Sequence, residues 1–309
     1  MKKNNMVCDL ETGVCGVVEE NELELIDFNK TEKSVDLYYV TDPICSHCWA
    51  IEPVIGRFVK QYGKHFNFHT VMGGLLEKWH DGPIDRANGI YKPADVAGHW
   101  REVGQYSRMP IDGSLMVDNP VQSSYPPSHV FKIIQKNYNE KIASEYLRRA
   151  REALFVFNEN ISERSVLVEL VNQLGLDGEI IVSEAERPIG QQLLNEDFDL
   201  VKTLGVRGFP TIIIVNKENK GVKIVGGQPL QAYIDGLKQV INTEELRPAE
   251  QPSLLAFLET EKMIFSKEIE VMYDLDKWEV HSFIEQQLSA DQYELKEILG
   301  ETYLVAANK

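Results

Sequence analysis

The sequence predicts an α/β fold in which an inserted helical subdomain divides one mixed sheet and a helical appendage follows that sheet. The first observation is a strand–helix–strand pattern between residues 34 and 72. The second is the return of strand character at 211–215 and 222–225, between two helical patterns. The third is that the long segment between these two regions carries helical stripes and no strand pattern.

The first half of the sheet is expected within residues 34–84. The run SVDLYYVT at 34–41 predicts a buried strand, and a helical pattern begins at Cys45. Pro53 lies inside that pattern and is expected to kink the helix, because proline removes a backbone donor and its ring collides with the preceding turn. A crossover helix joins parallel strands, so the strand at 66–72 should run parallel to the first.

The inserted helical subdomain is expected at residues 85–192. Two apolar stripes recur there at helical spacing, and they comprise Ile142, Tyr146, Leu147, Ala150 and Leu154, then Ile161, Leu167, Leu170, Val171 and Leu174. Gly175 marks the end of the second helix. A segment of this length with its own apolar faces is a subdomain and not a loop.

The second half of the sheet is expected at residues 193–243. A helix ends at Gly205, a β-hairpin joins 211–215 to 222–225 through NKENKG, and a last helix begins near Pro229. When the inserted block is removed, the remaining order of elements is β-α-β-α-β-β-α. The sequence therefore predicts a thioredoxin fold with an insertion.

Two terminal regions flank this fold. Residues 1–33 are polar without a clear period and predict an N-terminal arm that carries Cys8 and Cys15. Residues 244–309 predict an acidic C-terminal helical appendage of three helices, with a short strand at 303–306. From Pro248 onward the chain has 5 Lys/Arg against 13 Asp/Glu, so the appendage lacks the basic face that a DNA-binding module needs.

Composition restricts the partners and the compartment. The net charge is −16 and no Lys/Arg block occurs, which argues against nucleic acids and anionic membranes as partners. The first residues, MKKNNMVCDLETGVC, contain no apolar signal-peptide segment, and no apolar run approaches the roughly 20 residues that span a bilayer. We therefore expect a cytoplasmic protein, in which a Cys pair is catalytic, redox-sensing or metal-binding and not a structural staple.

The motif CSHC at 45–48 carries the predicted chemistry. Cys45 lies where a strand ends and a helix begins, and there the free N–H groups and the helix dipole favour a thiolate. In such motifs the thiol pKa falls from about 8.5 to about 3.5–7.5. His47 adds a partial positive charge between the sulfurs. We expect Cys45 to be the exposed attacking thiolate and Cys48 the resolving thiol.

Alternatives remain open for the four cysteines. Cys45 and Cys48 are interpreted as a redox pair, with half of a zinc site or inert packing as the other interpretations. Cys8 and Cys15 are a second redox pair, metal ligands, or unrelated thiols of the arm. We predict no cofactor and no bound metal.

Three residues near the motif have secondary predictions. Trp49 is expected to pack where the inserted subdomain meets the sheet. Glu52 is expected to be a solvated helix carboxylate, with acceptance of the Cys48 proton as the alternative. Trp79 is expected to be structural, with a pocket wall as the alternative.

Pro210 lies directly before the third strand, in GFPTIII. A cis bond occurs at only about 5–6% of X-Pro positions. The presence of a Cys-x-x-Cys motif at the start of a helix in the same fold raises the expectation of a cis Phe209–Pro210 bond next to the cysteines.

The motif CSHCW, the helical insertion and GVRGFPT together resemble the DsbA-like thioredoxin-fold proteins, and within them the FrnE-type cytosolic branch, over residues 34–242. The resemblance implies a redox pair at Cys45 and Cys48. It also implies a substrate-binding loop at 209–211, formed by Phe209, Pro210 and Thr211, that receives protein or peptide thiols and disulfides. Phe209 departs from the Val or Thr that often precedes this proline.

The tail segment FSKEIEVMYDL at 265–275 resembles the tail of YjbH-type proteins, which also have a cysteine-bearing N-terminal arm. These proteins are DsbA-like adaptors that deliver the regulator Spx to the ClpXP protease. Two functions are thus predicted: a thiol-disulfide oxidoreductase or isomerase, and, as the alternative, an adaptor that binds a regulator with little or no catalysis.

Overall fold

The computed structural model describes residues 8–9, 14–15, 35–80 and 88–307. Predictions that concern other residues, including most of the N-terminal arm, lie outside this range. The chain divides into two compact units, residues 1–32 and 33–309. In the first unit, strand β1 (Cys8–Asp9) pairs antiparallel with β2 (Val14–Cys15), and the backbone of Cys8 lies opposite that of Cys15.

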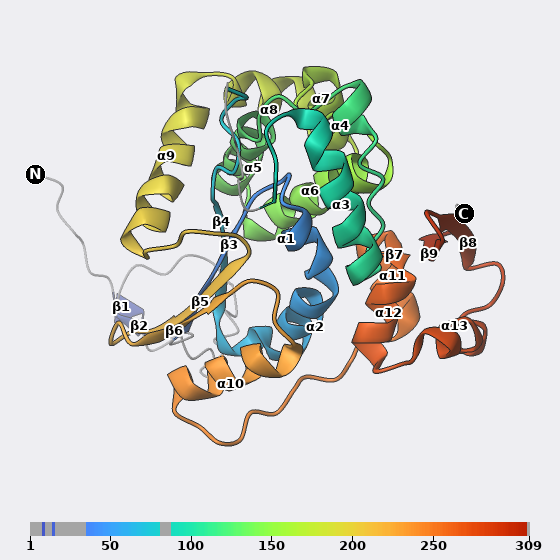
Figure 1. Cartoon of the computed structure of the whole chain (residues 1–309). Coiled ribbons are helices and arrows are strands. Elements are labelled where there is room, and N and C mark those ends of the chain that lie inside the picture. Colours follow the sequence, from blue (N-terminus) through green and yellow to red (C-terminus); the bar gives the residue numbers. More distant parts are fainter. Residues whose placement is uncertain (1–7, 10–13, 16–34, 81–87, 308–309) are drawn as a thin grey trace, which may run out of the picture. The chain divides into compact units, whose positions relative to one another are not determined.

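A four-stranded mixed sheet forms the centre of the second unit (Figure 1). Its strands are β3 (Val35–Thr41), β4 (Asn67–Met72), β5 (Thr211–Asn216) and β6 (Gly221–Val225). The order is β4-β3-β5-β6, with β3 and β4 parallel and the other neighbours antiparallel. The predicted strands and the predicted parallel pairing are confirmed.

One face of the sheet is covered by α2 (Glu52–Tyr62) and α10 (Leu230–Ile241). The alternate strand residues Leu37 and Tyr39 point into this core, where they join Phe58 and Tyr233. A short helix, α1 (Ser46–Ala50), precedes α2, and a 3₁₀ turn, η1 (Gly63–His65), follows it. The helical run breaks at Ile51, with Pro53 in the first turn of α2, so the predicted kink is confirmed.

Between β4 and β5 the described residues form helices joined by loops, and no strand is present among them. The helices are α3 (Pro93–Ser107), α4 (Leu115–Asp118), α5 (Tyr125–Asn137), α6 (Glu140–Arg151), a π-helical turn η2 (Glu152–Val156), α7 (Arg164–Asn172), α8 (Gly178–Ala185) and α9 (Pro188–Thr203). Both α6 and α9 contact β4. None of the helices in the described ranges is long and apolar enough to cross a membrane.

The C-terminal appendage combines helices with a small sheet. It comprises α11 (Leu254–Glu261), β7 (Met263–Phe265), α12 (Ser266–Tyr273), the 3₁₀ turn η3 (Lys277–Glu279), α13 (Val280–Gln287), β8 (Tyr293–Ile298) and β9 (Glu301–Ala306). The antiparallel order is β7-β9-β8. The sequence predicted β9 and missed the other two strands, because β7 has only three residues and β8, YELKEI, alternates apolar and charged residues over only its first four positions.

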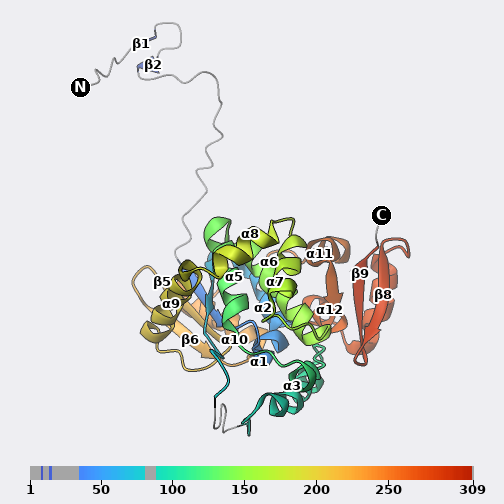
Figure 2. The ribbon, with the colours of Figure 1, turned by 90° about the horizontal axis from the view of Figure 1, so that it is seen from above.

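The appendage packs against the rest of the second unit (Figure 2). Helix α12 contacts α2, and the side chains of Met263, Phe265 and Tyr303 belong to the apolar core of the inserted subdomain. The appendage also has an apolar cluster of its own, which includes Leu258 and Ile269. It is therefore continuous with the body and does not hang from a linker.

Candidate functional site

The two cysteines of the CSHC motif form a disulfide, with 5.2 Å between their Cα atoms. Cys45 is the N-cap of α1, and its Sγ accepts a hydrogen bond from the backbone N of Cys48 at 3.2 Å. The backbone N of Cys45 in turn donates to the carbonyl of Asp42 at 3.2 Å. The turn after β3 thus fixes both cysteines, and the spacing of three residues brings the sulfurs together on one side of the first helical turn.

The two cysteines differ little in exposure. Only 5% of Cys45 and none of Cys48 is exposed. The prediction of an exposed Cys45 is therefore wrong for the disulfide form. The reason is that α3 of the inserted subdomain contacts α1. Cys45 is reached through a pocket and not from an open surface.

This pocket, the disulfide pocket, has a volume of about 450 Å³. Its walls come from α1, the segment after β4, α3 and the loop before β5, and they include Cys45, Leu76, Trp79, Trp100, Arg207 and Phe209. Trp79 is held in place by a hydrogen bond from its Nε1 to the carbonyl of Val121 at 2.9 Å. The alternative interpretation of Trp79 as a pocket wall is confirmed.

The loop before β5 has the expected conformation. The Phe209–Pro210 peptide bond is cis, and Phe209 lines the disulfide pocket with Cys45. Thr211 is buried at the start of β5, where its hydroxyl donates to the carbonyl of Gly208 at 2.8 Å. Gly73 lies against the Phe209 ring so closely that a Cβ atom at residue 73 would overlap it. Of the three predicted substrate-binding residues, only Phe209 lines the pocket.

Positive and neutral groups surround the disulfide. Among the described lining residues none is Asp or Glu, whereas His47, His99 and Arg207 are present. The rings of His47 and His99 lie 5.3 Å apart. Arg207 is exposed and forms no ion pair within the described part of the chain. His47 lines the disulfide pocket together with Cys45, and its role in stabilising a Cys45 thiolate stays a prediction.

Asp42 is a buried carboxylate behind the wall of the disulfide pocket. Its Oδ1 accepts from the backbone N of Ile44 at 3.0 Å, and its Oδ2 accepts from the N of Leu75 at 2.7 Å and the hydroxyl of Ser124 at 2.9 Å. Burial raises its pKa to about 6, and these hydrogen bonds oppose the shift. Asp42 thus ties together three segments around the pocket. The sequence analysis missed this role, because two of the partners are distant in sequence.

Trp49, the residue after Cys48, is fully buried, which confirms its predicted packing role. Its ring stacks on Phe155 of the inserted subdomain at 6.0 Å and meets Phe265 of the appendage edge-on at 5.7 Å. The Arg148 guanidinium lies 4.9 Å from the ring centre. The helix that carries the disulfide therefore touches all three parts of the second unit.

Two buried arginines join these parts. Arg148 of α6 forms ion pairs with Glu152 at 2.6 Å and with Glu268 of α12 at 2.7 Å. Arg151 forms an ion pair with Glu52 and donates to the carbonyl of Asp42 at 3.2 Å. The prediction of a solvated Glu52 is wrong: burial raises the pKa of Glu52, and Arg151 opposes that shift.

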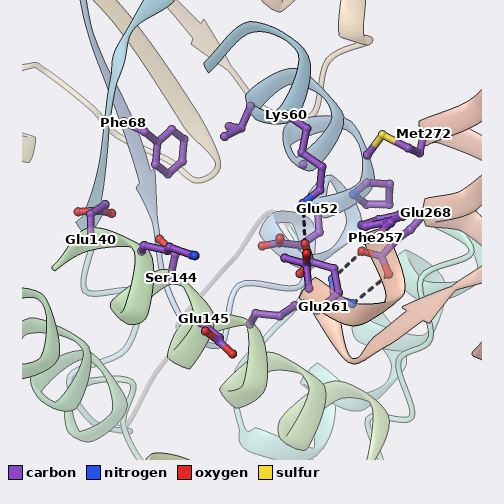
Figure 3. A pocket seen from close by; sticks show the side chains of 16 residues that line it. Glu52, Lys60, Phe68, Glu140, Ser144, Glu145, Phe257, Glu261, Glu268 and Met272 are labelled. Atoms are coloured by element: carbon purple, nitrogen blue, oxygen red, sulfur yellow. Dashed lines mark hydrogen bonds and ion pairs between the residues drawn. The ribbon is translucent and has the colours of Figure 1, made fainter. Parts of the chain in front are cut away.

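A second cavity, the junction pocket, has Arg148 and Glu52 among its lining residues. Figure 3 shows this pocket with Glu52, Glu261 and Glu268 labelled. It has a volume of about 580 Å³ and is lined by residues of α2, α6, α11 and α12. The charged lining residues are Glu52, Glu140, Glu145, Glu261, Glu268, Lys60, Lys141 and Arg148. Lys60 pairs with Glu261 at 2.7 Å. Most of these charges are thus already engaged by neighbouring groups.

Two predictions concern metal binding and the cysteines of the N-terminal arm. In the described ranges, no three His, Cys, Asp or Glu side chains form a group that could hold a metal ion. The side chains of Cys8 and Cys15 lie outside the described features, so their role as a second redox pair stays a prediction.

Similar proteins fall into two groups, which match either about two thirds of the chain or most of it. A family model described as "Thioredoxin" matches residues 38–235. The cytosolic disulfide reductase DsbM from Pseudomonas aeruginosa has a similar solved structure, with a TM-score of 0.51, 23% identity, and coverage of 65% of this chain and 97% of that chain. About a third of this chain has no counterpart there.

Curated relatives extend further. The ClpXP adapter protein SpxH of Halalkalibacterium halodurans is 27% identical over 301 residues, which cover 95% of this chain and 94% of that protein. The protein of the same description from Bacillus subtilis is 28% identical over 253 residues, with 81% of each chain covered. The longer of these alignments includes most of the C-terminal appendage.

Proposed function

The chain belongs to the thioredoxin family, and from this premise we propose that it acts as an adapter, which binds a regulator such as Spx in the cytoplasm and presents it to the ClpXP protease. The observation that carries the proposal is the integration of the appendage into the body. Phe265 contacts Trp49, and Glu268 forms a buried ion pair with Arg148. A relative described as a ClpXP adapter protein aligns across 95% of the chain, which includes most of the appendage.

Physical arguments support a binding role. The appendage adds a surface to the body that holds the disulfide pocket, and none of the described residues that line this pocket belongs to the appendage. The net charge of −16 favours fast association with a basic partner surface. Such a role needs a rigid arrangement of the two parts, which the buried contacts provide.

A degradation assay tests the adapter function. Purified ClpXP and Spx are incubated with and without the protein, and the loss of Spx is followed on gels. We expect the protein to raise the degradation rate several-fold. The Cys45→Ser/Cys48→Ser double variant is expected to behave like the wild type, because an adapter needs no disulfide exchange. If Spx is degraded at the same rate with and without the protein, the adapter proposal fails.

Thiol-disulfide exchange is the second candidate, favoured by the position of the disulfide opposite Phe209 in one pocket. A substrate thiolate attacks Cys45 Sγ, and the bond to Cys48 breaks with its electrons on Cys48 Sγ. Reduction by dithiothreitol, measured by alkylation and mass spectrometry, tests this step. Wild-type protein should gain two alkylated thiols at residues 45 and 48. Resistance of the native protein to dithiothreitol would contradict it.

A further inference from the structure

We propose that the junction pocket is the docking site for the adapter's protein client, and that it receives a client segment in which an apolar side chain lies next to a lysine or arginine. This inference rests on the proposed adapter function. It adds the place at which the client is recognised and the chemistry of the recognised segment. Thiol exchange at Cys45 and Cys48 plays no part in it.

The appendage completes this pocket. Helices α2 and α6 and strand β4 supply part of its lining, and the appendage supplies the rest, which is Phe257, Thr260, Glu261, Glu268 and Met272. The thioredoxin family match ends at residue 235, before all five of these residues. A relative described as a ClpXP adapter protein aligns across 95% of this chain. The pocket is therefore formed jointly by the body and by the part of the chain that lies beyond the family match.

A glycine leaves space in the wall of the pocket. Gly56 lies inside α2 and lines the pocket, although glycine destabilises a helix interior relative to alanine. Neither packing nor backbone geometry requires it, because a Cβ atom there would meet nothing within 4 Å and Gly56 is not among the residues of positive φ. A residue that costs helix stability without serving a contact is consistent with space kept for a ligand.

The walls of the pocket offer apolar surface to a ligand. Val59 and Phe68 are only half-buried by the protein's own side chains. Figure 3 shows Phe68 on one side of the pocket and Phe257 and Met272 on the other. The volume of about 580 Å³ lies within the roughly 300–1,000 Å³ of sites that enclose small ligands, so it has room for anchoring side chains.

Glu145 is the lining glutamate whose carboxylate has no partner within the described part of the chain. It is half-buried on α6, where its neighbours at four-residue spacing are Lys141 and Arg149. Arg149 instead pairs with Glu152 and donates to the carbonyl of Glu261. Lys141 lies N-terminal to Glu145, the less favourable order for a helical ion pair, and forms none with it. A cation from outside can therefore reach the Glu145 carboxylate.

These features together determine the chemistry of the client segment. The lining contains five glutamates against Lys60, Lys141 and Arg148, so an anionic segment would be repelled. A lysine or arginine can pack its aliphatic stem on the apolar walls while its charged end reaches Glu145. A neighbouring apolar side chain would cover Val59 and Phe68. Anchors of this kind, which fill a pocket at an interface, carry most of the binding energy of protein complexes.

Two matched glycine variants test the location of the site. Gly56→Leu fills the pocket, whereas Gly98→Leu adds the same side chain to α3, where Gly98 is exposed, has no atom within 4 Å of its Cβ position and does not line the junction pocket. Binding of fluorescently labelled Spx is measured by anisotropy with each full-length variant. We expect Gly56→Leu to weaken binding about tenfold or more, and Gly98→Leu to bind like the wild type. Thermal unfolding checks that both variants fold.

Two matched charge variants test the cation. Glu145→Gln removes the unpaired carboxylate, and Glu196→Gln removes an exposed carboxylate of α9 that does not line the pocket. At low ionic strength we expect Glu145→Gln to weaken Spx binding about two- to fivefold and Glu196→Gln to leave it unchanged. Added salt should reduce the difference between the wild type and Glu145→Gln.

Photo-crosslinking tests the chemistry of the client segment. The photoreactive residue p-benzoylphenylalanine is placed at position 141, on the exposed part of the pocket lining, or at position 202, which is exposed on α9 and outside the lining. We expect crosslinks to Spx from position 141 and not from position 202. Mass spectrometry should locate them in a segment with an apolar residue beside a lysine or arginine. A crosslinked segment without a basic residue would contradict the proposed chemistry.

Other outcomes would overturn the inference and leave the adapter function standing. Wild-type stimulation of Spx degradation, together with equal Spx binding by Gly56→Leu and Gly98→Leu, would place the client elsewhere. If n-hexylamine raised the unfolding temperature of the wild type but not of Gly56→Leu, while both bound Spx equally, the pocket would be assigned to a free amine. Wild-type protein that neither binds Spx nor speeds its degradation would overturn the adapter function as well.

Discussion

The disulfide pocket and the junction pocket have similar volumes, about 450 and 580 Å³, but opposite electrostatic designs. The described lining of the first contains Arg207 and two histidines and no carboxylate. The lining of the second contains five glutamates and three cations, and four of those glutamates hold ion pairs or hydrogen bonds to neighbouring elements. In the described part of the chain, Arg207 of the first pocket forms no ion pair, whereas most charged residues of the second pocket are paired with neighbouring groups.

This difference shows that the net charge of the whole chain does not predict which charged residues line an individual pocket. A chain of net charge −16 places many carboxylates where elements from distant parts of the sequence meet, and there they bind arginines and lysines. Around the disulfide, by contrast, the described pocket lining contains no carboxylate. The ion pairs around the junction pocket therefore hold distant parts of the chain together.

The largest expected effect comes from breaking the junction at Arg148. Arg148→Met leaves Glu268 buried without its cation and leaves Glu152 with Arg149 alone, which should lower the free energy of unfolding by about 3–5 kcal/mol. Urea unfolding followed by circular dichroism measures it. Arg164→Met is the control, because Arg164 also pairs with two glutamates but is exposed, and its unfolding midpoint should hardly change. Equal midpoints for both variants would contradict this account.

The substitution Asp42→Asn tests whether the buried carboxylate behind the disulfide pocket makes the stability of the protein depend on pH. The pKa of Asp42 is raised from 3.8 to about 6, so between these pH values the folded chain holds a proton that the unfolded chain has lost. The free energy of unfolding therefore falls as the pH rises from about 4 to about 6, by about 3 kcal/mol from this group alone.

The measurement compares urea unfolding of wild type and Asp42→Asn across that pH range. Other buried carboxyls contribute equally to both proteins, so the wild type should lose more stability than the variant as the pH rises. Parallel curves for the two proteins would show that Asp42 does not titrate in this window.

Alanine substitutions at two glycines, one next to each pocket, should have smaller effects on stability. In Gly73→Ala the new methyl group overlaps the Phe209 ring, so we expect a loss of about 1–3 kcal/mol and slower reduction of the disulfide. In Gly56→Ala, on the wall of the junction pocket, the methyl group meets no atom within 4 Å. Alanine favours the helix there, so stability should hold or rise. Thermal unfolding and reduction rates measure both, and a stable Gly73→Ala with unchanged rates would refute the predicted overlap.

Local patterns predicted much of the fold and part of the site. The strands of the central sheet, the kink at Pro53 and the cis bond at Pro210 each follow from a few neighbouring residues. The exposure of Cys45 could not be predicted, because the helix that covers it, α3, begins 48 residues later. The pairs Arg151–Glu52 and Arg148–Glu268 span 99 and 120 residues, and no local signal marks their partners.

The contact of Trp49 with Phe265 has a consequence for where this molecule can be cut. The family match ends at residue 235, yet a chain shortened to that point would lose Phe265 and Glu268 and expose the faces of Trp49 and Arg148 that they cover. The region that matches the family is thus shorter than the region that can be expected to fold by itself. Residues beyond the match complete the packing of its interior.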